Sequence, residues 1–221
     1  MRRLYHQPLS PFCRKVRLVL AEKRIEVELQ EEPFWEERMD FLRLNPGGKV
    51  PVLRIDGLVL AESSAICEYL DETHPTPPLL PTSPAERAEA RRLAGWFDDK
   101  FHQEVTANLL HERVYRRLMK TGHPESARIK AGARNIKYHI DYIGWLMEGR
   151  RWLAGDQLSI ADFAAAAQLS SLDYIGDVDW ERSAPMRDWY AKIKSRPAFR
   201  SILADLVPGF SPPQHYADLD F

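Results

Sequence analysis

The sequence predicts two domains, a small α/β domain followed by an all-helical bundle, and three observations support this. Up to residue 73, strand-like and helix-like segments alternate in the order βαβ then ββα, which is typical of a thioredoxin-like domain. Residues 74–82 are rich in proline, which neither a helix nor a central strand tolerates, and form a predicted linker. Residues 83–206 show only helical patterns, and residues 207–221 form a tail that we expect to be irregular.

The elements of the first domain follow from hydrophobic periodicity and turn residues. Residues 25–29 alternate apolar and acidic side chains, as in a strand with one buried face. Asp56-Gly57 between two apolar runs is a strong signal for a tight hairpin turn. In chain order we expect a strand at Leu4 and Tyr5, a helix at 11–24, a strand at 25–29, a short helix at 36–44, strands at 50–55 and 58–60, and a helix at 63–72.

The second domain is expected to be a bundle of helices. Its first helix has Ser83 as N-cap, Pro84 as first helical residue and Glu86 placed to return a hydrogen bond. Apolar residues from Leu93 to Leu109 recur at helical spacing and form one buried stripe. After a turn at 122–124, further helices are expected up to residue 149, at 160–172, at 186–194 and at 197–206, and the alanine-rich helix at 160–172 should be buried at the centre.

The composition is that of a folded protein without a strong charge. The chain has 221 residues, with 31 Lys and Arg against 32 Asp and Glu, so its formal net charge is -1. A generic nucleic-acid-binding protein would carry a basic excess, so nucleic acid is not expected as a partner. No apolar run of about 18 residues occurs, so no membrane insertion is expected. The start Met-Arg-Arg-Leu-Tyr-His lacks the features of a secretion signal, which favours a cytoplasmic location.

Two cysteines, Cys13 and Cys67, are too few for a disulfide framework or a four-thiolate zinc site, and no metal site is predicted. Cys13 lies one turn inside the first predicted helix and has no partner for a Cys-x-x-Cys pair. We therefore interpret it as a small buried thiol rather than a redox group. Cys67 falls in the middle of a predicted helix and should belong to the core.

The layout and four motifs resemble the cytosolic glutathione transferase superfamily over the whole chain. Ser-Pro-Phe-Cys-Arg at 10–14 lies where that family keeps its catalytic Ser, Tyr or Cys. Lys-Val-Pro-Val-Leu at 49–53 is similar to its cis-proline loop, and Glu-Ser-Ser-Ala-Ile at 62–66 to its γ-glutamyl-binding turn. Leu-Ser-Ile-Ala-Asp-Phe at 158–163 is similar to the capping box of its buried helix. The resemblance implies the two-domain glutathione transferase fold.

The resemblance also implies a glutathione site with Ser10 as the catalytic residue. A helix N-terminus favours an anionic thiolate, and the Ser10 hydroxyl could donate a hydrogen bond to it. Ser is also a preferred N-cap, so a purely structural role for Ser10 is equally open. A cis bond before Pro51 would expose the backbone that in the family pairs with glutathione. Glutathione is thus a possible ligand rather than a required cofactor, at the positions Lys49, Val50, Pro51, Glu62 and Ser63.

Three features fall outside this site. Trp35 interrupts an acidic stretch and is either a surface anchor for a partner or a side chain folded back over the domain edge. Basic residues between 113 and 134, among them Arg116 and Arg117, flank one turn and would attract an acidic partner or an anionic substrate unless they form a solvated face. The tail ends in mixed aromatic, acidic and apolar residues that could dock on their own domain or contact a partner: Tyr216, Asp218, Leu219, Asp220 and Phe221.

Within the superfamily, the chain is similar to a bacterial subgroup, the FzlA-like division proteins, in its overall layout, its Ser-Pro-Phe-Cys helix start and its Tyr-Ala-Asp-Leu-Asp-Phe terminus. This resemblance implies a homodimer that binds the tubulin-like division protein FtsZ and whose glutathione pocket no longer catalyses. The alternative is a glutathione transferase that conjugates glutathione to electrophilic small molecules, with Ser10 activating the thiolate. A thiol-reducing relative that uses Cys13 is disfavoured, because Ser10 holds the position that such relatives give to the nucleophilic cysteine.

Overall fold

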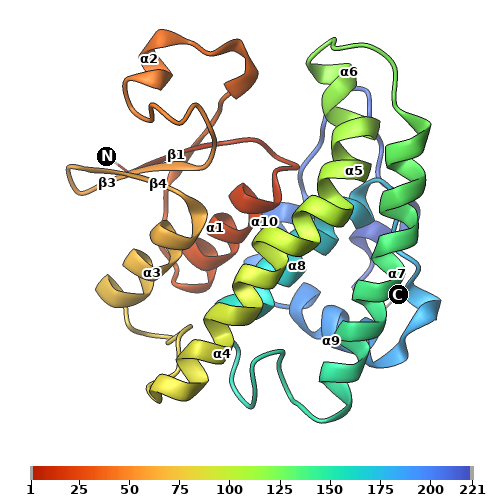
Figure 1. The fold of residues 1–221 in the computed structure, drawn as a ribbon. Coiled ribbons are helices and arrows are strands. Elements are labelled where there is room, and N and C mark those ends of the chain that lie inside the picture. Colours follow the sequence, from red (N-terminus) through yellow and green to blue (C-terminus); the bar gives the residue numbers. More distant parts are fainter. Residues whose placement is uncertain (1, 220–221) are drawn as a thin grey trace.

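The first domain contains, in chain order, β1 (Arg3–His6), α1 (Pro11–Glu22), β2 (Glu28–Glu31), α2 (Met39–Leu42), β3 (Val52–Ile55), β4 (Leu58–Ala61) and α3 (Ser63–Thr73). The computed structural model describes residues 2–219. The strands form one mixed sheet in the order β2-β1-β3-β4, with α1 and α3 on the side that faces the helical domain (Figure 1). β1 runs parallel to β2 and antiparallel to β3, and β3 runs antiparallel to β4. The predicted βαβ-ββα order is confirmed.

The predicted hairpin turn is also confirmed, since Asp56 and Gly57 have positive φ angles of 50° and 87°. The second strand, however, begins at Glu28 and not at Ile25. The Ile25 N–H donates to the Leu20 carbonyl at 2.8 Å, and Arg24 has a φ of 55°, so these residues end α1 in a left-handed cap. The apolar alternation at 25–29 therefore spans a helix cap and a strand start, which periodicity alone does not separate.

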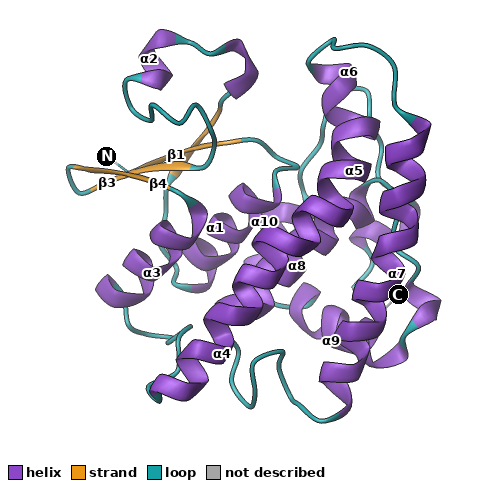
Figure 2. Cartoon of the chain, viewed as in Figure 1, coloured by secondary structure: helices purple, strands orange, loops and turns teal. Residues whose placement is uncertain are grey.

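The helical domain begins with a long continuous helical run. It comprises α4 (Pro84–Gly95), a π-helical stretch (Trp96–Thr106), α5 (Ala107–Leu110), a second π-helical stretch (His111–Tyr115) and α6 (Arg116–Leu118). It is followed by α7 (Ser126–Glu148), α8 (Ile160–Tyr174), α9 (Ala184–Lys194) and α10 (Arg200–Leu203), and the tail forms a short 3-10 turn at Gln214–Ala217. Figure 2 shows that all strands lie in the first domain. Every residue of α8 is buried, as predicted for the central helix.

Two predicted helix starts differ in how they are capped. At α8, Ser159 and Asp162 form the predicted capping box, and Asp162 also accepts hydrogen bonds from the Leu153 N–H and the Trp189 indole. At α4, Ser83 and Pro84 lie at the predicted positions, but the Ser83 side chain makes no capping hydrogen bond. The start of α4 therefore lacks a side-chain cap, whereas the start of α8 is held by buried hydrogen bonds.

Helix α1 joins the two domains through basic side chains that are buried and paired. Arg14 is fully buried and donates to the Pro8 carbonyl at 2.7 Å and the Ser170 hydroxyl at 3.0 Å. Lys15 forms an ion pair with Asp98 of the helical domain. Because such side chains stay buried only when paired, the domains are held in one fixed arrangement around the cleft between them.

Two further observations concern membrane spans and metal sites. No described helix is both long and apolar enough to cross a membrane. Within residues 2–219, no group of three or more His, Cys, Asp or Glu side chains is placed to hold a metal ion.

Candidate functional site

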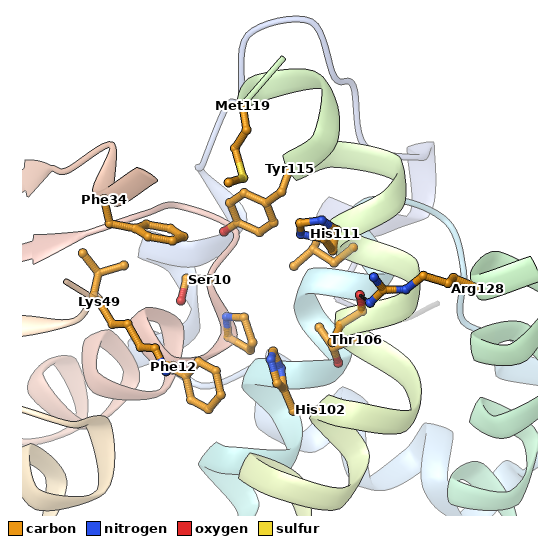
Figure 3. A pocket seen from close by; sticks show the side chains of 14 residues that line it. Ser10, Phe12, Phe34, Lys49, His102, Thr106, His111, Tyr115, Met119 and Arg128 are labelled. Atoms are coloured by element: carbon orange, nitrogen blue, oxygen red, sulfur yellow. Dashed lines mark hydrogen bonds between the residues drawn. The ribbon is translucent and has the colours of Figure 1, made fainter. Parts of the chain in front are cut away.

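Ser10 lies at the N-terminus of α1 and faces the cleft between the domains. Its hydroxyl accepts the Cys13 N–H at 3.4 Å, so it caps the helix, and it also lines a cavity (Figure 3). Capping uses one lone pair of the hydroxyl and leaves its proton available to a ligand. The capping role and the thiolate-activating role predicted as alternatives are therefore compatible in geometry.

Unlike Ser10, Cys13 does not line the cavity. Its side chain is completely buried, and its Sγ accepts the Gln7 N–H at 3.4 Å. Burial raises the pKa of the Cys13 thiol to about 11, so the reactive thiolate is disfavoured at neutral pH. Cys67 is 1% exposed, and burial raises the pKa of its thiol to about 12. Both cysteines are buried thiols of the core, as the sequence predicted.

The loop before β3 presents backbone to the cleft. The Val50–Pro51 peptide is cis, as predicted. Among residues 2–219, no backbone hydrogen bond forms at the N–H or C=O of Val50, which lines the cavity beside Ser10. Lys49 is exposed at the same edge, and its carbonyl accepts from Asn45 at 2.8 Å. The arrangement leaves one free edge of extended backbone for an extended ligand.

The start of α3 forms the polar end of the cleft. Glu62 has a φ of 69°, which is rare for residues other than glycine. Together with Ser63 and Ser64 it lines a cavity of about 310 Å³ at the N-terminus of α3, where the first N–H groups of a helix have no partner within the helix. Lys15 and Asp98 close the floor of this end, and the Ser64 hydroxyl bonds to both at 3.2 Å. Helix N–H groups beside acidic side chains suit a group that carries both a carboxylate and an ammonium.

A larger and more apolar cavity of about 380 Å³ adjoins the polar one, and Phe12, Lys49 and Val50 line both. Figure 3 shows its walls: Phe34 from the first domain faces Tyr115 and Met119 from the helical domain, and Phe12 lies against His102, with ring centroids 4.7 Å apart. The remaining lining includes Pro11, Thr106, Ala107, Leu110, His111 and Arg128. Together the two cavities form a cleft with a polar end for a peptide-like ligand and an apolar end for a second group.

Sequence reasoning found the first-domain side of this cleft and missed the helical side. Burial lowers the pKa of His102 and raises that of the Tyr115 phenol, so both side chains are neutral at physiological pH. Tyr115 has arginines as its neighbours in the sequence, and Arg128 belongs to the same basic run. From the sequence, this region is therefore interpreted as a charged turn. These residues come close to Ser10 because α1 and the long helical run both pack against α8, and α7 packs against the long run.

The sequence predicts Trp35 either as an exposed anchor or as a side chain folded over the domain edge, and its position is intermediate between the two. It is half-buried in a 3-10 turn (Phe34–Glu36), and its ring is 6.3 Å from the ring of Tyr115 in the helical domain. It lines a notch of about 260 Å³ between the domains, together with the tail-proximal residues Leu206, Val207 and Pro208. Leu206 is 80% exposed at this notch. Trp35 therefore belongs to a small apolar surface that spans both domains.

The basic turn is largely neutralised within the chain. Arg116 forms ion pairs with the fully buried Glu112 and with Glu125, and its side chain is only 16% exposed. Arg117 donates to a tail carbonyl at 3.3 Å and lies over the ring of Phe210 at 5.2 Å. The basic turn should attract an acidic partner less strongly than the sequence indicated, because Glu112, which precedes the basic run, pairs with two of its arginines.

The tail docks on its own domain through Tyr216. This residue is 1% exposed, its hydroxyl donates to the Ile202 carbonyl at 3.2 Å, and its ring meets that of Tyr174 edge-on. The guanidinium of Arg14 lies 6.0 Å from the Tyr216 ring centre. Tyr216, predicted as a partner contact, is thus an anchor whose side chain does not reach the surface.

The end of the tail lies beyond this anchor. Asp218 and Leu219 are exposed, whereas Asp220 and Phe221 fall outside the described residues. Within the described residues, neither Asp218 nor Leu219 lines the notch that contains Trp35. The structure therefore brings the start of the tail, but not its end, to the notch at Trp35.

Comparisons with known proteins agree with this architecture. A sequence model of the family "Glutathione S-transferase, N-terminal domain" matches residues 4–78. FtsZ-localized protein A of Caulobacter vibrioides is 49% identical over 100% of this chain and 98% of its own length. The solved structure of a glutathione S-transferase from Rhodospirillum rubrum F11 matches with a TM-score of 0.97 and 51% identity, covering 100% of both chains. FzlA from C. crescentus matches with a TM-score of 0.96 and 49% identity, covering 100% of this chain and 99% of that one. The chain belongs to the glutathione S-transferase family.

Proposed function

We propose that this protein is a GST-fold cell-division regulator that binds FtsZ polymers and acts in the bacterial cytoplasm. The observation that carries the proposal is the 49% identity to FtsZ-localized protein A, which extends over 100% of this chain. A match of that extent includes the helical domain and the tail, not the glutathione-binding half alone. The proposal therefore concerns the surface of the whole chain, and it does not depend on catalysis in the cleft.

Two exposed surfaces are the candidate contacts with FtsZ. The first is the notch at Trp35, where Leu206 adds an exposed apolar side chain and Glu31 an exposed carboxylate. A half-buried tryptophan in an apolar notch is a frequent centre of binding energy at protein interfaces. The second is the acidic end of the tail from Asp218 onward. The anchoring of Tyr216 fixes the point on the helical domain from which this segment begins.

Co-sedimentation with FtsZ polymers tests this proposal. Trp35→Ala and Asp218→Lys should each lower the fraction that sediments, and removal of residues 218–221 should do the same while leaving the Tyr216 anchor intact. Glu181→Lys is the matched control for charge, because Glu181 is 87% exposed on the helical domain. Unchanged sedimentation of all three test variants would refute the proposed surfaces. No sedimentation of the unaltered protein would refute the function itself.

A second candidate function, glutathione conjugation, is favoured by the intact geometry of the cleft. The free Val50 backbone, the helix start at Ser63 and the Ser10 hydroxyl fit the cysteinyl part, the γ-glutamyl carboxylate and the thiol of glutathione, respectively. Calorimetry with glutathione, followed by a conjugation assay with an electrophilic aromatic substrate, tests it. Saturable binding with activity that disappears in Ser10→Ala would establish an enzyme, whereas binding without activity would establish a ligand site.

We further propose that the chain forms a homodimer. Leu58 and Val59 on the edge strand β4 are 46% and 43% exposed, and Tyr138 and Trp145 on α7 are 56% and 63% exposed. Figure 1 shows β4 and α7 on opposite sides of α4, so a two-fold axis near α4 would place each apolar patch on the other. Light scattering should give twice the chain mass, and Trp145→Glu should give the monomer. A monomeric parent protein would overturn this arrangement.

A further inference from the structure

Three aromatic rings connect the apolar cavity of the cleft with the notch at Trp35. Phe34 and Trp35 follow one another in the 3-10 turn, and their ring centroids are 5.2 Å apart. Each ring centroid also lies 6.3 Å from that of Tyr115, with interplanar angles of 63° and 67°. These edge-on contacts are favourable for aromatic pairs, so the three rings form one packed unit across the domain boundary.

The two hollows share a wall made of this unit. Phe34 lines the apolar cavity, Trp35 lines the notch, and Tyr115 lines both. The turn is tied down at its two ends, where the Glu32 N–H donates to the His6 carbonyl at 2.9 Å and Arg38 pairs with the buried Glu32 carboxylate. No residue of the turn itself is buried. A shift of the Tyr115 ring must therefore be taken up by Phe34 and Trp35.

The Tyr115 hydroxyl is directed into the apolar cavity, on the side of Ser10 and Phe34 (Figure 3). It makes no hydrogen bond within residues 2–219, and it stays protonated because burial raises the pKa of the phenol. Lys49 stands at one end of the cavity and Arg128 at the other. A flat apolar molecule with an anionic or hydrogen-bond-accepting group would fill the walls and engage the Tyr115 hydroxyl.

We propose that the apolar cavity is a regulatory site for the partner surface, in which an amphipathic aromatic anion repositions Tyr115 and thereby the exposure of Trp35 in the notch. The link to FtsZ rests on the proposed function, whereas the link between cavity and Trp35 does not. A ligand shifts such an equilibrium only through contacts that differ between the two arrangements. Here the differing contact is the hydrogen bond to Tyr115 together with the packing against Phe34.

The probe is anilinonaphthalene sulfonate, an aromatic anion whose fluorescence rises in an apolar site. Binding is measured by fluorescence titration, and Trp35 is observed by fluorine NMR of protein labelled with fluorotryptophan, its resonance being the one that Trp35→Phe removes. Saturation with the probe should shift the Trp35 resonance and leave that of Trp145, on α7, in place. Probe binding without movement of the Trp35 resonance, or no probe binding, would overturn the proposal.

Two variants locate the effect. Ala107→Phe fills the cavity from α5 and should abolish both probe binding and the shift of the Trp35 resonance. A shift that persists in this variant would show that the probe acts elsewhere, which contradicts the proposal. Tyr115→Phe keeps the ring and removes the hydroxyl, so it should fold normally and bind the probe roughly fivefold more weakly, as expected for one lost hydrogen bond. An unchanged affinity would exclude Tyr115 as the contact that carries the signal.

FtsZ co-sedimentation completes the test and separates the two proposals. Saturating probe should change the apparent affinity of the unaltered protein for FtsZ polymers by about fivefold or more, a typical size for coupled sites, and should leave Ala107→Phe unaffected. If the probe does not change co-sedimentation with FtsZ, the proposed regulation is wrong and the proposed function is unaffected. A Trp35 shift in a protein that never sediments with FtsZ overturns the proposed function and leaves the coupling between cavity and notch standing.

Discussion

Arg17 of α1 and Asp205 beyond α10 form a two-pronged ion pair that joins the first domain to the C-terminal part of the helical domain. The guanidinium Nη1 lies 2.8 Å from one carboxylate oxygen of Asp205, and Nη2 lies 2.9 Å from the other. Arg14, which is fully buried, reaches the same carboxylate at 3.3 Å. One acidic side chain thus pairs with two buried arginines at the domain boundary, both in the helix that Ser10 caps.

Removal of this carboxylate should destabilise the protein strongly. Asp205→Ala leaves Arg14 and Arg17 buried without their counter-charge, and loss of one partner of a buried pair typically costs about 3–5 kcal/mol. Urea unfolding measures the loss. Glu181→Ala is the matched control, because Glu181 pairs with Arg187 while 87% exposed and should matter by less than about 1 kcal/mol. Equal losses in the two variants would contradict a structural role for Asp205.

Two helical glycines should respond in opposite directions to alanine. A Cβ at Gly132 of α7 would lie 2.7 Å from the Leu109 side chain and 3.1 Å from that of Asn108, whereas a Cβ at Gly95 of α4 would meet nothing within 4 Å. Gly132→Ala should therefore destabilise by about 1–3 kcal/mol through overpacking. Gly95→Ala should stabilise by up to about 1 kcal/mol through helix propensity. Thermal unfolding of both variants checks this, and a gain in stability for Gly132→Ala would show that α7 and α5 are not packed so closely.

Protonation of His6 should reduce stability in mild acid. Burial, and then the charge of Arg17, lowers the pKa of His6 to about 4 from the ordinary 6.5. Between these values the unfolded chain binds a proton that the folded chain does not, so the free energy of unfolding falls as pH decreases from 6.5 to 4. The full difference corresponds to about 3 kcal/mol.

His6→Leu removes this contribution without loss of a bond at Nδ1, which has no hydrogen-bond partner in the structure of residues 2–219. Urea unfolding from pH 7.5 to 4.5 should show a smaller fall in stability for the variant than for the parent protein, and equal slopes above pH 7. Parallel curves over the acidic range would mean that other groups, and not His6, determine the acid response.

The sequence predicts what depends on local pattern and misses what depends on the meeting of distant segments. Pro51, the Asp56-Gly57 turn and the capping box of Ser159 each have a local chemical signature, and the structure contains all three. The partner of Lys15, by contrast, is Asp98, 83 residues away along the chain. No periodicity indicates such a pairing, so the sequence assigns no partner to the basic residues of α1.

The candidate site shows the same division. Ser10, Lys49, Val50 and the start of α3 occur as contiguous motifs of the first domain, and they do meet in one cleft. Tyr115 belongs to the cleft only because the long helical run packs against α8, as α1 does, and its neighbours in sequence are charged. Prediction of the helical wall would have required the angle between the two domains, which depends on buried ion pairs rather than on a motif.

Glu62, the residue before α3, has a strained backbone conformation. Its φ of 69° and ψ of 118° lie in a region that side chains rarely occupy, and such a residue typically costs about 1–3 kcal/mol. Glu62→Gly should therefore raise the free energy of unfolding, while Glu62→Ala keeps the strain and should leave it nearly unchanged. If the helix start at Ser63 binds glutathione, both variants should bind it more weakly in calorimetry, since both lose the carboxylate that faces the ligand's ammonium group. A stability gain that is equal in the two variants would point to charge repulsion around Glu62 instead of backbone strain.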